Sequence, residues 1–82
     1  MKAWYVYILR CGDDTLYTGA TEDIARRIAT HNSGKGAKYT RSRLPVTLMY
    51  WEECETRSMA LKREAAIKRL TRQEKLALIN RN

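Results

Sequence analysis

The chain contains few of the residues that interrupt or cross-link a polypeptide. Among its 82 residues are one proline, four glycines, two cysteines and one histidine. It has no repeat or low-complexity segment, and 44 % hydrophobic with 30 % charged residues is typical of a folded protein rather than a disordered one. We expect one domain over residues 1–82 with a small core, because a chain of this size buries only about 60 to 65 % of its unfolded surface.

The same scarcities exclude several kinds of site and location. No stretch approaches the roughly 20 consecutive apolar residues that a transmembrane helix needs. Residues 3–9 are apolar, but Arg10 follows this short run and no small residue precedes Cys11, so we expect no secretion signal. Cys11 and Cys54 form no CxxC pair, and we interpret them as reduced thiols of a cytoplasmic protein. Two cysteines and one histidine cannot complete a four-ligand zinc site.

The chain has many more basic than acidic residues. Sixteen Lys and Arg against nine Asp and Glu give a net charge of +7, which favours a polyanionic partner, with nucleic acid as the first candidate. The basic residues gather in two clusters, the first with Lys35, Lys38, Arg41 and Arg43 and the second with Arg57, Lys62, Arg63, Lys68, Arg69, Arg72 and Lys75. A merely solvated helix face is the alternative interpretation of the second cluster.

Turn and periodicity signals predict a β-hairpin followed by a helix. Residues 2–9 are apolar on both alternating sets, as in a central strand, residues 12–15 supply turn chemistry and residues 16–20 continue as a second strand. Thr21 is the expected N-cap of a helix with Glu22 and Asp23 in its first turn, running to about Asn32. Residues 33–36 are expected to break this helix, and the basic stretch to Arg43 to form a loop with a short turn around residues 37–41.

The rest of the chain predicts one strand and two helices. Residues 46–51 read as a strand with Pro45 at its start, where the missing backbone donor does least harm. Residues 56–70 are strongly helical, and Thr71-Arg72-Gln73-Glu74 matches a capping box that starts a further helix. The order ββα-β-αα predicts a small α/β (α+β) domain, with a three-stranded, mostly antiparallel sheet flanked by helices.

Two polar residues of the first predicted helix are expected to face the sheet. At about 100° per residue, Arg27 and His31 fall on the same side of the helix as Ile24, whereas Arg26 points to water. His31 is the only histidine, and imidazole is the side chain that ordinarily titrates near neutral pH. Both residues are candidates for a polar cluster over the hairpin, with a purely structural role for His31 as the alternative.

Glu64 is also polar in an apolar position. It falls inside the apolar arc of the helix over residues 56–70, where a carboxylate is destabilising unless it is paired or binds a metal. A salt bridge to Lys68, one turn further on, is the alternative to a metal site. The chain holds no supported Ser/His/Asp set, and residues 32–36 lack the spacing of a phosphate-binding P-loop, so those two mechanisms are set aside.

The two tyrosines of the hairpin share a face only under one condition. Tyr7 and Tyr17 meet on one side of the sheet if the loop has an odd number of residues or a strand carries a bulge. A loop of residues 12–14 meets this condition and pairs Tyr7 with Gly19. We expect Gly19, which lacks a side chain, to leave space beside Tyr7 for a phosphate.

Five polar positions in this order resemble the GIY-YIG nuclease superfamily. They are Tyr7 in Tyr5-Val6-Tyr7, Tyr17 in Tyr17-Thr18-Gly19 ten residues later, Arg27, His31 and Glu64. The similarity covers about residues 4–70 and is greatest to small single-domain bacterial members, the uncharacterised branch of the superfamily. It implies metal-dependent hydrolysis of a phosphodiester.

The resemblance also implies a role for each position. Glu64 would hold one Mg²⁺ or Mn²⁺ and Arg27 would bind the scissile phosphate with its two-pronged guanidinium. Tyr7 is the preferred general base or water-positioning group and Tyr17 orients the nucleophile or phosphate, although the two roles are exchangeable. A phenolate at pH 7 needs stabilisation of about 4 kcal/mol, to which a hydrogen bond from His31 contributes unless His31 assists the leaving oxygen instead.

The basic stretch after the first helix is expected to hold the nucleic-acid backbone without sequence preference. Its members are Lys35, Lys38, Tyr39, Arg41 and Arg43. Tyr39 either stacks on a base or packs under the loop. The leading hypothesis is a DNA endonuclease, selective for structure or strand, in DNA repair or processing. The alternatives are a basic DNA- or RNA-binding module without turnover, since the additional polar residue of some relatives would fall on Leu76, and an RNA-associated accessory protein. The oligomeric state stays open.

Overall fold

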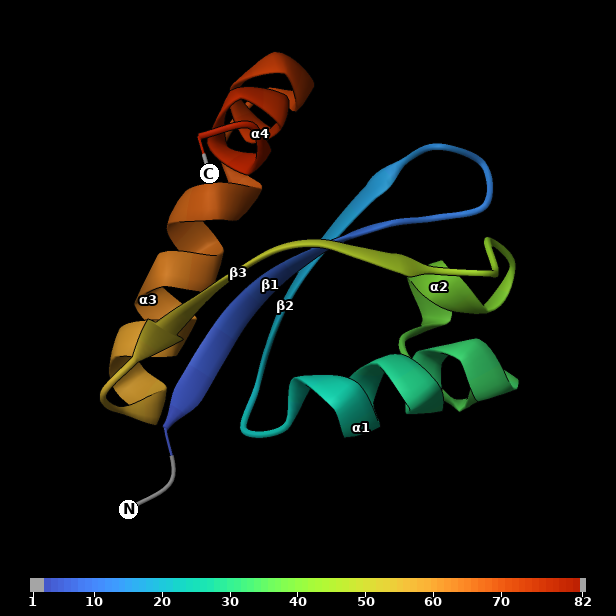
Figure 1. Cartoon of the computed structure of the whole chain (residues 1–82), viewed down its shortest axis with the longest axis horizontal. Coiled ribbons are helices and arrows are strands. Elements are labelled where there is room, and N and C mark those ends of the chain that lie inside the picture. The colour runs from blue at the N-terminus through green and yellow to red at the C-terminus, as the bar shows by residue number, and fades with distance from the viewer. Residues whose placement is uncertain (1–2, 82) are drawn as a thin grey trace.

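The computed structural model describes residues 3–81 and has a three-stranded sheet with helices on both faces. Figure 1 shows α3 and α4 on one side of the sheet and α1 and α2 on the other. The strand order is β2-β1-β3 and both pairings are antiparallel, which confirms the predicted fold and the central first strand. The elements are β1 (Trp4–Arg10), β2 (Leu16–Thr21), α1 (Ile24–Thr30), a π-helical turn η1 (His31–Lys35), α2 (Lys38–Arg41), β3 (Thr47–Cys54), α3 (Arg57–Lys68) and α4 (Arg72–Ile79).

Strand β1 supplies side chains to two different layers. Successive side chains of a strand point to opposite faces, so alternate residues of β1 enter separate clusters. The cluster under α3 and α4 consists of Val6, Ile8, Ala60, Ile67 and Leu78. The cluster on the α1 side consists of Tyr7, Leu9, Cys11 and Val46, with Ile28 of α1 packed against it.

The hairpin has the predicted register. Tyr7 pairs with Gly19 and Leu9 pairs with Tyr17, so the two tyrosines share a face. The amide of Cys11 donates to the carbonyl of Thr15 at 2.8 Å and closes a three-residue loop. Lys2, which was expected to open the first strand, lies outside the described residues.

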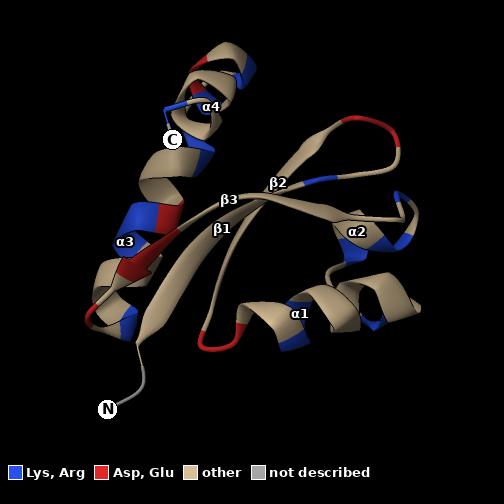
Figure 2. Ribbon diagram, in the orientation of Figure 1, with Lys and Arg blue, Asp and Glu red and all other residues tan. Residues whose placement is uncertain are grey.

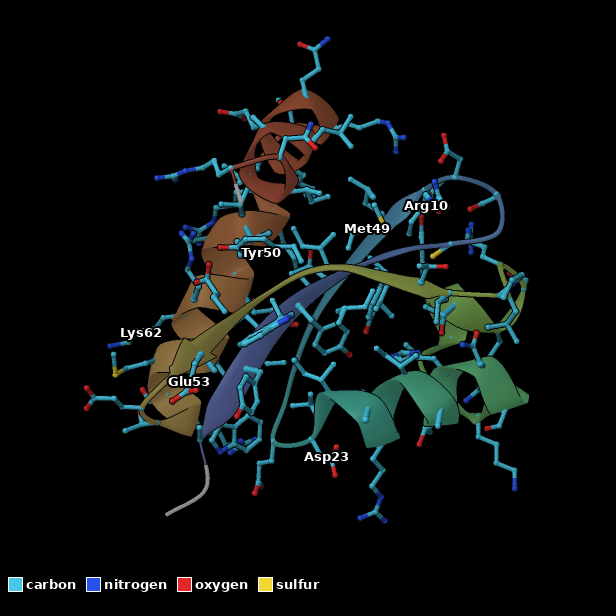
Figure 3. All side chains as sticks on the ribbon, in the orientation of Figure 1. Arg10, Asp23, Met49, Tyr50, Glu53 and Lys62 are labelled. Atoms are coloured by element: carbon cyan, nitrogen blue, oxygen red, sulfur yellow. The ribbon has the colours of Figure 1, made fainter. Side chains whose placement is uncertain are left out.

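The start of α1 differs from the prediction. Thr21 is the last residue of β2, paired with Tyr5, and is therefore not the N-cap. The cap is Asp23, labelled in Figure 3 at the start of α1, whose carboxylate accepts from the amide of Arg26 at 3.1 Å. The Thr21 hydroxyl is occupied in the preceding turn, where it accepts from the Asp23 amide at 3.2 Å. The predicted first-turn acids thus lie before the helix.

The predicted break after α1 lies in η1, within residues 33–36 as expected. Helical structure continues through Lys35, and Gly34 departs from it with the left-handed φ of 82° that glycine adopts most readily. The short turn expected in the basic stretch is the helix α2. Within residues 3–81 no helix is both long and apolar enough to cross a bilayer.

The C-terminal half follows the prediction closely. β3 runs on to Cys54, beyond its predicted end, because its pairing with β1 continues to Trp4. Thr56 caps α3, accepting from the amide of Met59. The capping box of α4 is confirmed, with Thr71 and Glu74 each accepting from the other's backbone amide.

Candidate active site

The first four residues of the resemblance come together on the α1 face of the sheet. β1 supplies Tyr7, β2 Tyr17, α1 Arg27 and η1 His31. The Tyr7 hydroxyl lies 3.2 Å from Nε2 of His31, and the Tyr17 ring centroid lies 5.4 Å from that of the imidazole. Arg27 lies close enough to the Tyr7 side chain to lower its pKa. The hairpin register and the helical spacing together create this cluster.

Burial separates the cluster into an inner and an outer part. Tyr7 is 1 % exposed and His31 is 0 % exposed. Tyr17 and Arg27 are only partly buried, and the Tyr17 hydroxyl has no hydrogen-bond partner within residues 3–81. Tyr17 and Arg27 are therefore the side chains open to a substrate, whereas Tyr7 and His31 lie behind them.

Electrostatics keep the inner pair in one protonation state. Burial raises the pKa of Tyr7, the nearby Arg27 guanidinium partly offsets the rise, and the charges of Tyr17 and Glu64 add to it. Burial lowers the pKa of His31, and the positive charge of Arg27 lowers it further. At neutral pH the phenol therefore keeps its proton and the imidazole is neutral.

Arg27 itself has no carboxylate partner in the described part of the chain. A partly buried guanidinium is stabilised by a hydrogen-bonded anion, and its fork matches a phosphate. The Arg27 guanidinium is therefore chemically suited to bind an anion.

Glu64 approaches the cluster from α3, and its negative charge contributes to the raised pKa of Tyr7 after the larger effect of burial. Its side chain is 18 % exposed, and Oε2 lies 2.8 Å from Nζ of Lys68. The salt bridge considered as the alternative for Glu64 is thus present. The hydrogen bond to Glu64 raises the pKa of Lys68, and the nearby Tyr17 adds to this effect.

The donor set fits a metal site that depends on one carboxylate. Within residues 3–81 no group of three or more His, Cys, Asp or Glu side chains is arranged to hold a metal ion. Mg²⁺, however, commonly uses one or two protein carboxylates and fills its other positions with waters and phosphate oxygens. Glu64 meets this requirement once its carboxylate is released from Lys68.

Gly19 serves a different purpose from the expected one. A Cβ built at residue 19 would lie 2.6 Å from Cζ of Tyr7. The space left by the missing side chain is therefore filled by the Tyr7 ring itself and is not kept open for a phosphate. Glycine at this position lets the ring lie flat against β2 and reach His31.

The basic stretch is divided between exposed and engaged side chains. Lys35 and Lys38 are exposed and have no carboxylate partner within residues 3–81. Arg41 is exposed but donates from Nε to the carbonyl of Gly36 at 3.2 Å. Figure 2 shows this positive charge around α2, beside the carboxyl end of α1.

Tyr39 and Arg43 connect the basic stretch to the candidate site. The Tyr39 ring stacks on Tyr17 with centroids 5.9 Å apart, and the Arg43 guanidinium lies 4.0 Å from the Tyr39 centroid. Arg43 also pairs with Asp13 at 3.0 Å. The Tyr39 ring thus packs on Tyr17 while staying 38 % exposed, and the proposed stacking on a base stays a prediction.

The second basic cluster is partly paired with acidic residues. Three of its seven members have carboxylate partners, in the pairs Arg63–Glu52, Lys68–Glu64 and Arg72–Asp14. These pairs reduce the positive charge that this surface offers to a second polyanion.

Thr40 is the residue of the cluster that the sequence did not reveal. It is 0 % exposed, and its hydroxyl lies 2.8 Å from Nδ1 of His31. A threonine inside a basic loop shows no periodicity, and α2 has only four residues. Thr40 reaches its position only because α2 packs back against His31.

Comparison with known proteins identifies relatives of this chain. The chain is 60 % identical over 78 residues to the UPF0213 protein DP2720 of Desulfotalea psychrophila, covering 94 % of this chain and 71 % of that protein. It is 56 % identical over 79 residues to the UPF0213 protein SpyM50708 of Streptococcus pyogenes, covering 95 % and 86 %.

Two solution NMR structures are also similar. The UPF0213 protein BH0048 from Bacillus halodurans is 45 % identical, with a TM-score of 0.60 over 94 % of this chain and 82 % of the other. EF2693 from E. faecalis is 47 % identical, with a TM-score of 0.62 over 95 % and 84 %. The GIY-YIG catalytic domain matches residues 3–77. The chain therefore belongs to the GIY-YIG family, whose catalytic domain points to nuclease activity on nucleic acid, and its relatives are small bacterial UPF0213 proteins.

Proposed function

We propose that the protein is a metal-dependent endonuclease that hydrolyses phosphodiester bonds in DNA, selects structure or strand rather than sequence, and acts in DNA repair or processing in the cytoplasm. The observation that carries this proposal is the state of Arg27. Arg27 is partly buried, lies close enough to Tyr7 to lower the pKa of that phenol, and has no carboxylate partner within residues 3–81. An outside phosphate is the natural anion for its guanidinium.

The surface beside Arg27 supports a nucleic-acid backbone. Lys35 and Lys38 are exposed and unpaired in the described chain, and they follow α1 in the sequence. Contacts of this kind give affinity without sequence preference and weaken steeply as salt rises. DNA is preferred over RNA in this proposal because the family resemblance points to DNA.

The reaction needs an attacking water, and Tyr17 is the residue best placed to orient it. Its hydroxyl has no hydrogen-bond partner among the residues that the structure describes, whereas that of Tyr7 is buried against His31. Between the two exchangeable roles, burial therefore favours Tyr17 as the water-positioning base and Tyr7 as the group that holds Arg27. Water adds to phosphorus and its proton passes through the Tyr17 oxygen to solvent. The bond from phosphorus to the leaving sugar oxygen breaks, and that oxygen takes a proton from solvent.

Glu64 is the residue that would hold the metal, as Mg²⁺ or Mn²⁺. A bound divalent ion supplies Lewis-acid stabilisation of the charge that develops on the phosphate. Arg27 contributes stabilisation of the same kind from the protein side. Lys68 occupies the Glu64 carboxylate in the structure, so loading of the site requires this side chain to withdraw.

The Glu64–Lys68 pair also favours a second candidate function. The Glu64 carboxylate already pairs with the Lys68 ammonium at 2.8 Å. A metal ion must displace this ammonium, so the pair weakens metal binding. The alternative is a DNA- or RNA-binding module with the same fold and little or no turnover.

A cleavage assay with matched variants tests the proposal. Purified protein is incubated with single-stranded, duplex and branched DNA and with RNA, in Mg²⁺, in Mn²⁺ and in chelator. We expect metal-dependent cleavage that is lost in Arg27→Ala and Glu64→Ala. Arg26→Ala and Glu55→Ala are the controls, because both residues are exposed and outside the cluster. Cleavage that survives both site changes would come from a contaminating nuclease.

Binding measured in the same series separates the two candidates. Salt-dependent binding without metal-dependent cleavage by the unmodified protein would establish the binding module and overturn the nuclease proposal. Binding that does not change between low and physiological salt would contradict the electrostatic contacts of Lys35 and Lys38.

A further inference from the structure

A continuous chain of hydrogen bonds lies beneath the candidate site. The Arg27 guanidinium lies close enough to the Tyr7 hydroxyl to lower its pKa, and that hydroxyl lies 3.2 Å from Nε2 of His31. On the other side of the imidazole, Nδ1 lies 2.8 Å from Oγ1 of Thr40, and that oxygen lies 2.9 Å from the carbonyl oxygen of Ala37. The chain thus links a charged side chain at the site to the backbone of the basic stretch.

The two ends of this chain fix its direction. A guanidinium has donors only and a carbonyl oxygen only accepts. Two oxygens 2.9 Å apart need a hydrogen between them, and the Thr40 hydroxyl supplies the only one available to the Thr40–Ala37 pair. Because that hydrogen is used there, the Thr40 oxygen can only accept from Nδ1 of His31.

The middle of the chain follows from its ends. His31 is fully buried, and burial together with the charge of Arg27 lowers its pKa, so the ring is neutral. A neutral imidazole with its hydrogen on Nδ1 has a free electron pair on Nε2, which accepts the hydrogen of the Tyr7 hydroxyl. The Tyr7 oxygen is then free to accept from Arg27. Every donor points from the site toward Ala37, an alignment in which successive bonds strengthen one another.

We propose that Thr40 is a positioning residue of the nuclease, whose hydroxyl fixes His31 in its Nδ1–H tautomer and through Tyr7 holds the Arg27 guanidinium ready for phosphate. The catalytic part of this inference rests on the proposed function, whereas the tautomer does not. With the hydrogen on Nε2 instead, His31 would donate to the Tyr7 oxygen and compete with Arg27 for it.

The fold holds Thr40 at this distance from two sides. α2 places the residue by a bond from the Thr40 amide to the Ala37 carbonyl at 3.1 Å. Gly36 allows the chain to close over His31, because a Cβ at residue 36 would lie 2.8 Å from Cα of His31. Thr40 also stands between Tyr39 and Arg41, so the residue that sets the imidazole belongs to the segment expected to contact nucleic acid.

The tautomer can be measured directly because His31 is the only histidine of the chain. Protein labelled with ¹⁵N gives one pair of imidazole nitrogen signals, which distinguish the Nδ1–H from the Nε2–H form. We expect Nδ1–H in the unmodified protein, a shift toward Nε2–H in Thr40→Val and a return to Nδ1–H in Thr40→Ser. Thr47→Val is the control, since Thr47 is an exposed residue at the start of β3.

Cleavage by the same variants tests the consequence for the site. Thr40→Val should lower kcat by about 10-fold, by analogy with the loss of a hydrogen-bond partner of a metal-binding histidine, with KM nearly unchanged. Thr40→Ser should recover most of the rate. The split between kcat and KM distinguishes loss of positioning from loss of substrate contacts.

Each outcome decides one part of the inference. An Nε2–H signal in the unmodified protein overturns it without any variant, and so does an unchanged Nδ1–H signal in folded Thr40→Val. A changed tautomer with unchanged cleavage removes Thr40 from the reaction while the nuclease function stands. If the unmodified protein does not cleave at all, the proposed function fails, and the nitrogen signals still test the hydrogen-bond chain.

Discussion

The two faces of the sheet are built from the same strands but have different roles. One forms an apolar core and the other carries the polar cluster of the candidate site. On the α3 and α4 side, Val6 and Ile8 enter an apolar cluster. On the α1 side, Tyr7 contacts His31 and His31 contacts Thr40, and both His31 and Thr40 are fully buried polar residues. Because β1 alternates between the layers, neighbouring residues belong to separate functions. The difference teaches that stability and chemistry should be separable by substitutions one residue apart.

The largest expected effect is on the α1 face. Tyr17→Phe removes the one phenol hydroxyl of the cluster that is free to orient water. We expect cleavage to fall by about 100-fold to 10,000-fold, the usual contribution of a general acid or base, with DNA binding nearly unchanged. Single-turnover cleavage together with a binding titration measures both quantities.

The matched controls for this change are on the adjacent strand. Tyr5→Phe alters a tyrosine on the same face, whose ring contacts Trp51 with centroids 5.8 Å apart, and should cleave normally. Tyr7→Phe is a second site variant and not a control. It should also lose cleavage, because Arg27 loses its interaction with the Tyr7 hydroxyl. Full activity of Tyr17→Phe would remove this residue from the chemistry and return the role to Tyr7.

The second-largest expected effect is on stability and comes from the opposite face, one residue along β1 from Tyr7. Ile8 is completely buried, and Ile8→Ala should lower the free energy of unfolding by about 2 to 5 kcal/mol. Denaturant unfolding measures this change. Leu61→Ala, on an exposed side chain of α3, should have a much smaller effect.

Cleavage by the folded fraction of Ile8→Ala should stay near that of the unmodified protein. A loss of cleavage greater than the unfolded fraction explains would show that the two faces are coupled and would break the comparison.

Loop length and helical periodicity in the sequence predicted most of the polar cluster on the α1 face. The odd loop length placed Tyr7 and Tyr17 on one face, as the register confirms. The helical spacing placed Arg27 and His31 toward the sheet, and burial of His31 agrees with that. These features follow from local geometry, in which spacing along the chain decides direction in space.

The features that sequence could not supply depend on contacts between distant segments. The N-cap moved from Thr21 to Asp23 because pairing between β1 and β2 extends further than the local pattern shows. Thr40 reaches His31 only through the closure over Gly36. The different depths of the two tyrosines depend on how α1 packs over the hairpin.

The third prediction concerns the one unsatisfied polar group among the described buried side chains. Thr18 pairs with Ile8 and so points toward the α3 face, where its buried hydroxyl has no partner. Thr18→Val keeps the shape and should raise the free energy of unfolding by about 1 kcal/mol, with Tm about 4 to 8 °C higher. Thermal unfolding beside Thr47→Val, an exposed control, checks this. A decrease would show that the hydroxyl is satisfied in solution.

The fourth prediction is a pH dependence confined to the α1 face. The pKa of His31 is lowered in the folded protein, chiefly by burial and also by Arg27, from an ordinary value of 6.5. The unfolded chain therefore binds more protons as the pH falls. The corresponding stability is present above about pH 6.5 and is lost as the pH falls through the lowered pKa.

Unfolding free energies measured between about pH 8 and pH 5 test this sign. His31→Gln should remove this part of the slope. An equal slope in both proteins would assign the pH dependence to other groups.

The smallest effect concerns the point where the two faces meet. α3 belongs to the apolar side, yet its Glu64 carries the carboxylate for the site and is held by Lys68 at 2.8 Å. Lys68→Met should strengthen Mn²⁺ binding by about twofold to fivefold, since an ion pair whose lysine is about half exposed contributes about 1 kcal/mol. Calorimetric titration measures the affinity, and Lys62→Met on the outer side of α3 (Figure 3) is the control. Weaker binding in Lys68→Met would show that the ammonium orients Glu64 for the metal and does not compete with it.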